Sequence, residues 1–174
     1  MDDVPAVVAS QEIFNGRIFK VRADTLEREG RRWRMDIVEH PGSFAIAALP
    51  AHDRIVLVQQ YRHAAGAQLW EIPAGIAESD ESCEAGARRE LREETGYTAD
   101  TLELLCRVFP TPGYCTERVW IYAARGLHAG AQQLEEDERI NVREVTLQQA
   151  CRMQASGEIT DMKTVLALLW LQRQ

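Results

Sequence analysis

The stretch GARRELREETG, residues 86–96, places three arginines and three glutamates around a single leucine, Leu91. At 3.6 residues per turn of an α-helix, Glu90 and Glu94 stand one above the other on one face, and Glu93 lies beside them. Like charges at this spacing destabilise a helix. The stretch therefore predicts a helix whose acidic face needs a positive partner.

The helix is expected to cover about residues 82–95, and Gly96 stands at the C′ position where glycine often ends a helix. Arg89 lies four residues before Glu93, so one interpretation is a solvated helix with internal ion pairs, each worth about 0.3–0.5 kcal/mol. That interpretation leaves the other two glutamates without a cation. Because carboxylate oxygens are the ligands that Mg²⁺ prefers, the alternative is a metal site.

The composition of the 174 residues is that of a globular protein, with 45% hydrophobic and 27% charged residues. The formal net charge of −7 argues against a protein that coats nucleic acid with a basic surface. No apolar run approaches the roughly 20 residues that cross a bilayer, and the acidic N-terminus does not resemble a signal peptide. The four cysteines show no C-x-x-C pattern. We therefore expect a cytoplasmic protein with reduced thiols and with neither nucleic-acid nor membrane partners.

The rest of the chain reads as short strands with a few helices between and after them. The expected strands cover residues 17–27, 31–40, 43–50, 54–62, 69–78, 101–109, 117–124 and 138–145, and further helices begin at Thr146 and near Asp161. The order shows no strict βαβα alternation, so it predicts an α/β (α+β) sandwich around a mixed sheet. We divide the chain into an N-terminal antiparallel β-region, residues 1–40, and a second domain, residues 41–174.

The charged helix belongs to a longer pattern that resembles the Nudix box, G-x5-E-x7-R-E-U-x-E-E-x-G-U, where U is an aliphatic residue. Its fixed positions are occupied here by Gly75, Glu81, Arg89, Glu90, Leu91, Glu93, Glu94 and Gly96. Tyr97 stands in the last aliphatic position and is the one departure. The resemblance implies the Nudix-type α/β/α sandwich and a hydrolase that splits a nucleoside diphosphate linked to another group.

The resemblance also implies a Mg²⁺ cofactor, for which Mn²⁺ can substitute, and assigns roles to the helix. Glu90, Glu94 and the carbonyl of Ala74 correspond to metal ligands. Glu93 corresponds to a further ligand or to one that acts through water, and Arg89 would orient the glutamates. Such ions neutralise phosphate charge and activate water for hydrolysis of a phosphoanhydride.

Sequences outside the box resemble the ADP-ribose pyrophosphatase subfamily. They are QQYR, WEIPAG, GEITDMKT and PTPGYCTERVWIY, the last with Pro112 fifteen positions after Tyr97. The implied reaction turns ADP-ribose into AMP and ribose 5-phosphate. GDP-mannose hydrolases share nearly all of these sequences, so another nucleoside diphosphate sugar is the alternative, and a non-catalytic Nudix-fold binding module is a third. The preferred base and sugar, the number of metal ions and the attacked phosphorus stay open.

Four residues outside the helix are candidates for substrate binding. Arg62 ends a strand and is either a phosphate clamp or a surface arginine. Glu117 either contacts the terminal sugar or is a strand-end charge, and Pro112 marks the subfamily. Trp33 either stacks on a base or faces the core among solvated arginines.

An acidic loop follows the Gly-containing segment ARGLHAGA. By resemblance, Glu136 corresponds to the catalytic base and Glu138 to a metal ligand, and a slip in the alignment would make Glu135 the base. A solvated acidic loop is the alternative. In related enzymes the N-terminal strands pack against a second subunit, so we also expect a homodimer.

Overall fold

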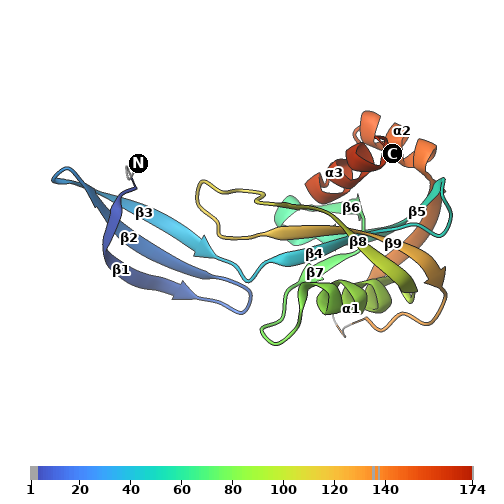
Figure 1. Cartoon of the computed structure of the whole chain (residues 1–174), viewed down its shortest axis with the longest axis horizontal. Helices are drawn as coiled ribbons and strands as arrows, with labels where there is room; N and C mark the ends of the chain where they lie inside the picture. The colour runs from blue at the N-terminus through green and yellow to red at the C-terminus, as the bar shows by residue number, and fades with distance from the viewer. Residues whose placement is uncertain (1–3, 135, 137, 174) are drawn as a thin grey trace. The chain divides into compact units, whose positions relative to one another are not determined.

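The computed structural model of the chain describes residues 4–134, 136 and 138–173 (Figure 1). The chain divides into two compact units. One unit contains residues 1–42 and 109–118, and the other contains residues 43–108 and 119–174. Among the described residues, no helix combines the length and the apolar character needed to cross a membrane.

The first unit is a three-stranded antiparallel sheet in the order β1-β2-β3. Its strands are β1 (Ala6–Asn15), β2 (Lys20–Arg28) and β3 (Arg31–Glu39). The predicted hairpin around Glu29 and Gly30 is confirmed, and both turn residues adopt positive φ angles of 52° and 75°. This left-handed pair suits the twist of a tight hairpin. The sequence reasoning missed β1, which lacks a clean alternation of apolar and polar residues.

The sheet of the first unit buries little of its own surface. Every residue of β1 is exposed, and within the three strands only Ala23 and Asp24 are buried. Ser10 and Arg22 both donate hydrogen bonds to Asp24 and so compensate its charge. The sheet of this unit therefore leaves apolar side chains exposed.

The second unit is built on a seven-stranded mixed sheet with the main order β10-β5-β4-β9-β8. Its strands are β4 (Ser43–Ala48), β5 (Arg54–Arg62), β6 (Ala67–Glu71), β7 (Ala74–Ile76), β8 (Thr98–Val108), β9 (Val119–His128) and β10 (Ile140–Thr146), with a short 3₁₀ turn, η1 (His63–Ala65), after β5. Strands β4 and β9 are parallel, and the other pairs are antiparallel. The predicted pairing of residues 43–50 with 54–62 is limited to Ala48 and Val56, because β4 pairs mainly with β7 and β9.

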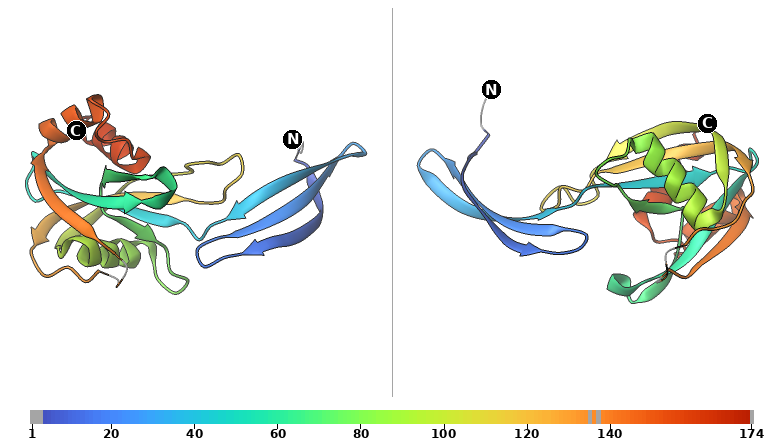
Figure 2. Two further views of the ribbon diagram at one scale, coloured as in Figure 1. Left: turned by 180° about the vertical axis from the view of Figure 1, so that it is seen from behind. Right: turned by 90° about the horizontal axis from the view of Figure 1, so that it is seen from below.

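Helices cover both faces of this sheet, as the fold prediction requires (Figures 1 and 2). They are α1 (Cys83–Thr95) on one face and α2 (Leu147–Ala155) with α3 (Met162–Leu171) on the other. All six residues of β4 are buried, with Phe44 and Ile46 on the side of α1 and Ala45 and Ala47 on the opposite side. The α/β/α sandwich around a mixed sheet is thus confirmed.

Local signals set the ends of α1 and its position on the sheet. The Ser82 side chain accepts a hydrogen bond from the Ala85 N–H, and Gly96 ends the helix with φ 76°. Leu91 is fully buried in the core beneath the helix. Gly86 is small for a steric reason, because a Cβ there would lie 2.2 Å from the Phe44 ring.

Candidate active site

The carboxylates of α1 face the backbone of β7 at close range. The exposed fractions of Glu90 and Glu94 are only 8% and 4%. A Cβ on Gly75 would lie 2.0 Å from the carboxyl carbon of Glu90, so only glycine leaves room for that carboxylate. The N–H of Ala74 donates a 2.9 Å hydrogen bond to Glu94. The structure thus brings together the box glycine and two of the glutamates predicted as metal ligands.

Arg89 joins the helix to the loop that precedes it. Its guanidinium forms two hydrogen bonds with Glu81, of 3.1 and 2.8 Å, and Nη1 lies 2.7 Å from Glu90 and 2.9 Å from Glu93. Nη2 also donates to the carbonyl of Ile76 at 3.1 Å. These hydrogen bonds to Arg89 lower the pKa of Glu81. Arg89 therefore holds Glu90, Glu93 and the preceding loop in one arrangement, and its orienting role in catalysis stays a prediction.

Burial leaves the two inner carboxylates with too little compensating charge. Desolvation raises the pKa of Glu90 to about 7, although Arg89 opposes the rise. Desolvation raises the pKa of Glu94 to about 8, although the Ala74 N–H opposes it. A divalent cation would supply the missing charge, and buried carboxylate oxygens are a donor set that fits Mg²⁺ or Mn²⁺.

The metal site itself stays a prediction. Within residues 4–134, 136 and 138–173, no three Asp, Glu, His or Cys side chains gather closely enough to enclose an ion. Instead, Arg89 donates hydrogen bonds to Glu90 and Glu93, and the Ala74 N–H donates one to Glu94.

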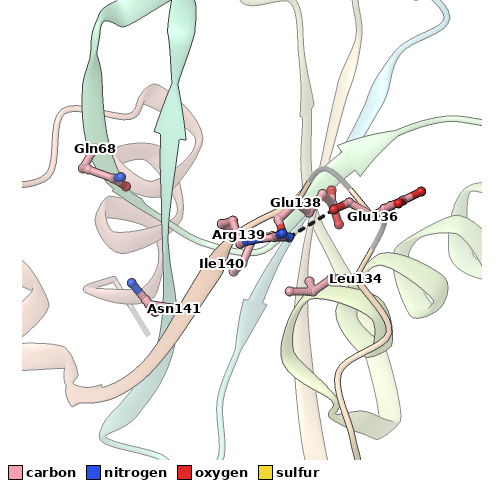
Figure 3. A pocket seen from close by; sticks show the side chains of 7 residues that line it. All are labelled: Gln68, Leu134, Glu136, Glu138, Arg139, Ile140 and Asn141. Carbon is pink, nitrogen blue, oxygen red and sulfur yellow. Dashed lines mark hydrogen bonds between the residues drawn. The ribbon is translucent and has the colours of Figure 1, made fainter.

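The acidic loop approaches this site from the C-terminal end of α1. Glu138 lies close enough to Glu90 and Glu94 to raise the pKa of each carboxyl electrostatically, after the larger effect of burial. Glu136 is exposed. Both residues line a cavity of about 450 Å³ between the loop, β6 and β10 (Figure 3). Glu135, the alternative base, lies outside the described residues.

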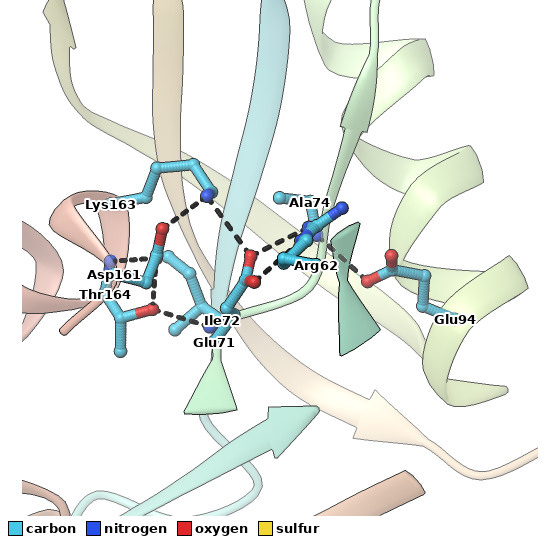
Figure 4. A network of polar contacts seen from close by, with 8 residues as sticks. All are labelled: Arg62, Glu71, Ile72, Ala74, Glu94, Asp161, Lys163 and Thr164. Carbon is cyan, nitrogen blue, oxygen red and sulfur yellow. Dashed lines mark hydrogen bonds and ion pairs between the residues drawn. The ribbon is translucent and has the colours of Figure 1, made fainter. Parts of the chain in front are cut away.

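Arg62 does not stand free on the surface, because it pairs with a buried carboxylate that the sequence reasoning did not single out. Its Nε and Nη2 atoms donate to the two oxygens of Glu71 at 2.7 and 2.8 Å, and Glu71 is 1% exposed. Lys163 lies 3.2 Å from Glu71 and 2.5 Å from Asp161, which caps α3 (Figure 4). The charges of Arg62 and Lys163 balance those of Glu71 and Asp161, and Nη1 of Arg62 forms no hydrogen bond with the part of the chain that the structure describes.

Sequence resemblance points to the segments that contain Glu71, Asp161 and Lys163, but not to the residues themselves. Glu71 stands in WEIPAG, and Asp161 and Lys163 stand in GEITDMKT, two of the sequences that resemble the subfamily. Their pairing across 92 positions of sequence could not be read from either motif alone.

The other predicted substrate residues belong to the first unit. Trp33 is half-buried on β3, opposite Leu26. Pro112 is exposed, and the Glu117 carboxylate lies 4.0 Å from His40. Their roles in substrate binding stay predictions.

Comparison with known proteins assigns the chain to a family. Residues 39–169 match the family model described as NUDIX domain, which covers most of the chain and contains all of the box. The chain belongs to the Nudix family. The earlier resemblance is thereby confirmed.

Curated relatives extend over nearly the whole of this Nudix chain. A methanol dehydrogenase activator from Bacillus methanolicus is 38% identical over 96% of the chain and 92% of its own length. ADP-ribose pyrophosphatases from Bacillus subtilis and Mycobacterium tuberculosis are 36% and 33% identical over 95% and 93% of the chain, and over 91% and 80% of their own lengths. A GDP-mannose pyrophosphatase from Citrobacter koseri is 39% identical, but over 67% of the chain and 65% of its own length.

A solved structure described as an ADP compounds hydrolase has the same fold as this Nudix chain. It superposes with a TM-score of 0.85 and covers 97% of this chain and 92% of its own. The sequences are 21% identical, so the likeness concerns the fold alone.

The raised pKa values predict how the stability of the metal-free Nudix protein depends on pH. A carboxyl whose pKa rises on folding binds protons better in the folded state, so its contribution is present at low pH and is lost as pH rises through the raised pKa. Between pH 4.5 and about 8, Glu94 should lower the free energy of unfolding by up to about 1.4 kcal/mol per pH unit. In urea titrations with EDTA, the free energy of unfolding should therefore decline less steeply with pH in Glu94→Gln than in the parent. When Mg²⁺ replaces EDTA, the decline in the parent should also become less steep.

The control for this pH series is Glu103→Gln, which alters an exposed glutamate on β8. It should keep the parent's slope. A Glu94→Gln protein with the same slope as the parent would contradict the origin assigned to the pH dependence.

The balanced cluster around Glu71 predicts a second effect on stability. Glu71→Gln removes the carboxylate shared by Arg62 and Lys163, and we expect the free energy of unfolding to fall by roughly 2–4 kcal/mol. The fall is limited because the Arg62 side chain is 38% exposed and its charge is partly solvated. Glu84→Gln breaks a surface pair with Arg88 and should change stability by no more than about 0.5 kcal/mol. Urea unfolding in EDTA at pH 7 measures both, and equal losses would show that burial of the pair is unimportant.

Proposed function

We propose that this protein is a Nudix hydrolase that cleaves the pyrophosphate bond of ADP-ribose, consuming water and releasing AMP and ribose 5-phosphate. The observation that carries the proposal is the pair of buried, undercompensated carboxylates on α1, Glu90 and Glu94. The two relatives named ADP-ribose pyrophosphatase, each similar over more than nine tenths of this chain, support the choice of substrate.

The residues that would hold Mg²⁺ are Glu90, Glu94, Glu138 and the carbonyl of Ala74. When bound, the ion would neutralise phosphate charge and make water a better nucleophile. The chain's own part is to hold these oxygens in place. Gly75 leaves the space that Glu90 occupies, and the Ala74 N–H orients Glu94. Glu93, held by Arg89, is a further ligand or acts through water.

The proton of the attacking water needs an acceptor from the chain. We assign this role to Glu136, which is exposed on the acidic loop and lines the cavity with Glu138. Arg62 would contact a substrate phosphate through the guanidinium edge that does not face Glu71. Pre-orientation by Glu71 lowers the entropic cost of that contact.

Three further substrate contacts are proposed from the sequence resemblance. Trp33 would stack on the base, since an indole offers a flat apolar face to a purine. Glu117 would accept hydrogen bonds from sugar hydroxyls, and Pro112 would shape the segment between Phe109 and Arg118. All three assignments rest on the sequence resemblance.

Two other functions are favoured by relatives. GDP-mannose is the alternative substrate, but the GDP-mannose pyrophosphatase resembles only two thirds of this chain. The relative named as a methanol dehydrogenase activator makes activation of a dehydrogenase a second candidate function. Addition of the purified protein to a methanol dehydrogenase assay tests it, because an unchanged rate excludes that candidate.

We also propose a homodimer formed through the first unit. Apolar side chains on β1 are exposed, including Val7, Ile13 and Phe14. A second copy of the same sheet would bury such a surface in a self-complementary interface. A cytoplasmic location is proposed as well, because the four cysteines are unpaired, as expected under reducing conditions.

The proposed reaction predicts AMP and ribose 5-phosphate from ADP-ribose in the presence of Mg²⁺ or Mn²⁺, and no turnover in EDTA. Glu94→Gln should keep the fold and lower kcat by more than the roughly 10- to 100-fold that loss of an outer-shell partner costs a metal site. Chromatographic separation of nucleotides measures both. Products from GDP-mannose but not from ADP-ribose would favour the alternative substrate. Absence of products from either would favour a binding module.

The proposed dimer predicts a mass of twice 19.7 kDa by light scattering. A double substitution, Val7→Asp with Ile13→Asp, places two charges on β1 and should shift the mass to that of one chain. Gln11→Asp adds one charge at an exposed polar position of the same strand and should leave the dimer intact at micromolar concentrations. A monomeric parent protein would refute the dimer.

A further inference from the structure

The acidic loop begins as a cap on the C-terminal end of α1. The last carbonyls of a helix lack partners within the helix. Here the main-chain N–H of Gln133 donates to the Glu93 carbonyl at 2.9 Å, and the side-chain Nε2 of Gln132 donates to the Glu94 carbonyl at 2.6 Å. Two carbonyls of the helix that carries the metal ligands are therefore satisfied by the loop.

Two glycines bring the backbones into direct contact at the same place. A Cβ on Gly96 would lie 2.4 Å from the carbonyl oxygen of Gly130, and a Cβ on Gly130 would lie 2.9 Å from that of Gly96. Any side chain at Gly96 would therefore separate the loop from α1. This contact sets the distance over which Gln132 can reach the helix.

The other end of the loop is also held. Nη1 of Arg139 donates to the carbonyls of Glu136 and Glu138, at 3.1 and 2.6 Å (Figure 3). Ile140 then pairs with Gln60 in the sheet. Glu136 and Glu138 thus lie between a contact with α1 on one side in sequence and a strand pairing in the sheet on the other.

Glu94 forms contacts through both its side chain and its main chain. Its carboxylate is fixed by the Ala74 N–H, and its main-chain carbonyl is fixed by Gln132. We propose that Gln132 is a positioning residue, which docks the acidic loop on α1 and so sets the distance from Glu136 and Glu138 to the α1 carboxylates. The proposal rests on the proposed function for its effect on catalysis, whereas the docking itself does not.

The chemistry of the contact specifies the variants. A helix C-terminus carries partial negative charge, so it needs a donor and favours a cation. Gln132→Met keeps the length and removes the donor, Gln132→Glu adds a repelled charge, and Gln132→Lys restores a donor. Because the bond is only partly buried and is one of several loop anchors, we expect kcat to fall about 3- to 10-fold in the Met variant and further in the Glu variant. The Lys variant should recover to within about twofold of the parent.

Two further readouts separate positioning from general stability. KM for ADP-ribose and the Tm should stay close to those of the parent in all three variants, because Gln132 is exposed and lies outside the core. Amide hydrogen exchange of Gln133, followed by NMR, should accelerate in the Met and Glu variants and return to the parent's rate in the Lys variant. The matched control for exchange is Gln133→Met, which keeps the main-chain N–H that donates to Glu93.

The outcomes distinguish the two hypotheses. Unchanged exchange and unchanged kcat in Gln132→Met would overturn the positioning role, as would failure of Gln132→Lys to restore both. If the parent protein does not hydrolyse ADP-ribose, the proposed function fails. The exchange measurement, which needs no substrate, would then still decide whether Gln132 docks the loop.

Discussion

The structure depends on one electrostatic constraint, the burial of the Glu90 and Glu94 carboxylates between α1 and β7. Burial removes the water that would stabilise their charges and raises the pKa of both groups. The chain provides only part of the compensation, through Arg89 and the Ala74 N–H. An incompletely compensated pair of this kind is suited to bind a cation, whereas a purely structural helix would gain nothing from it.

The surrounding packing keeps this pair in place. Leu91 seats α1 in the core, and Gly75 and Gly86 remove the side chains that would hold the helix away from the sheet. On the other side of the site, Arg62 and Lys163 pair with Glu71, and Lys163 also pairs with Asp161, so that two positive and two negative charges balance. The site therefore has one region at α1 that lacks positive charge and one region around Glu71 in which the charges balance.

Sequence reasoning succeeded where the signal is local. The bounds of α1 follow from the Ser82 cap, the helical period and Gly96, and the family follows from the spacing of Gly75 and the glutamates. It failed for β1, whose exposed residues show no regular alternation, and it overestimated the pairing of β4 with β5. Strand partners join distant segments, so the pattern within one strand does not specify them.

The sequence by itself determined the helix, its box of glutamates and the apolar runs of a sheet covered on both faces, because these depend on residue type and on spacing along the chain. Only the tertiary structure decided how the charges are partnered. It showed that Arg62 is held by Glu71, that Glu138 lies near Glu90 and Glu94, and that Gln132 caps α1. Such contacts join segments far apart in sequence, and their energies depend on desolvation, which exists only once the chain has folded.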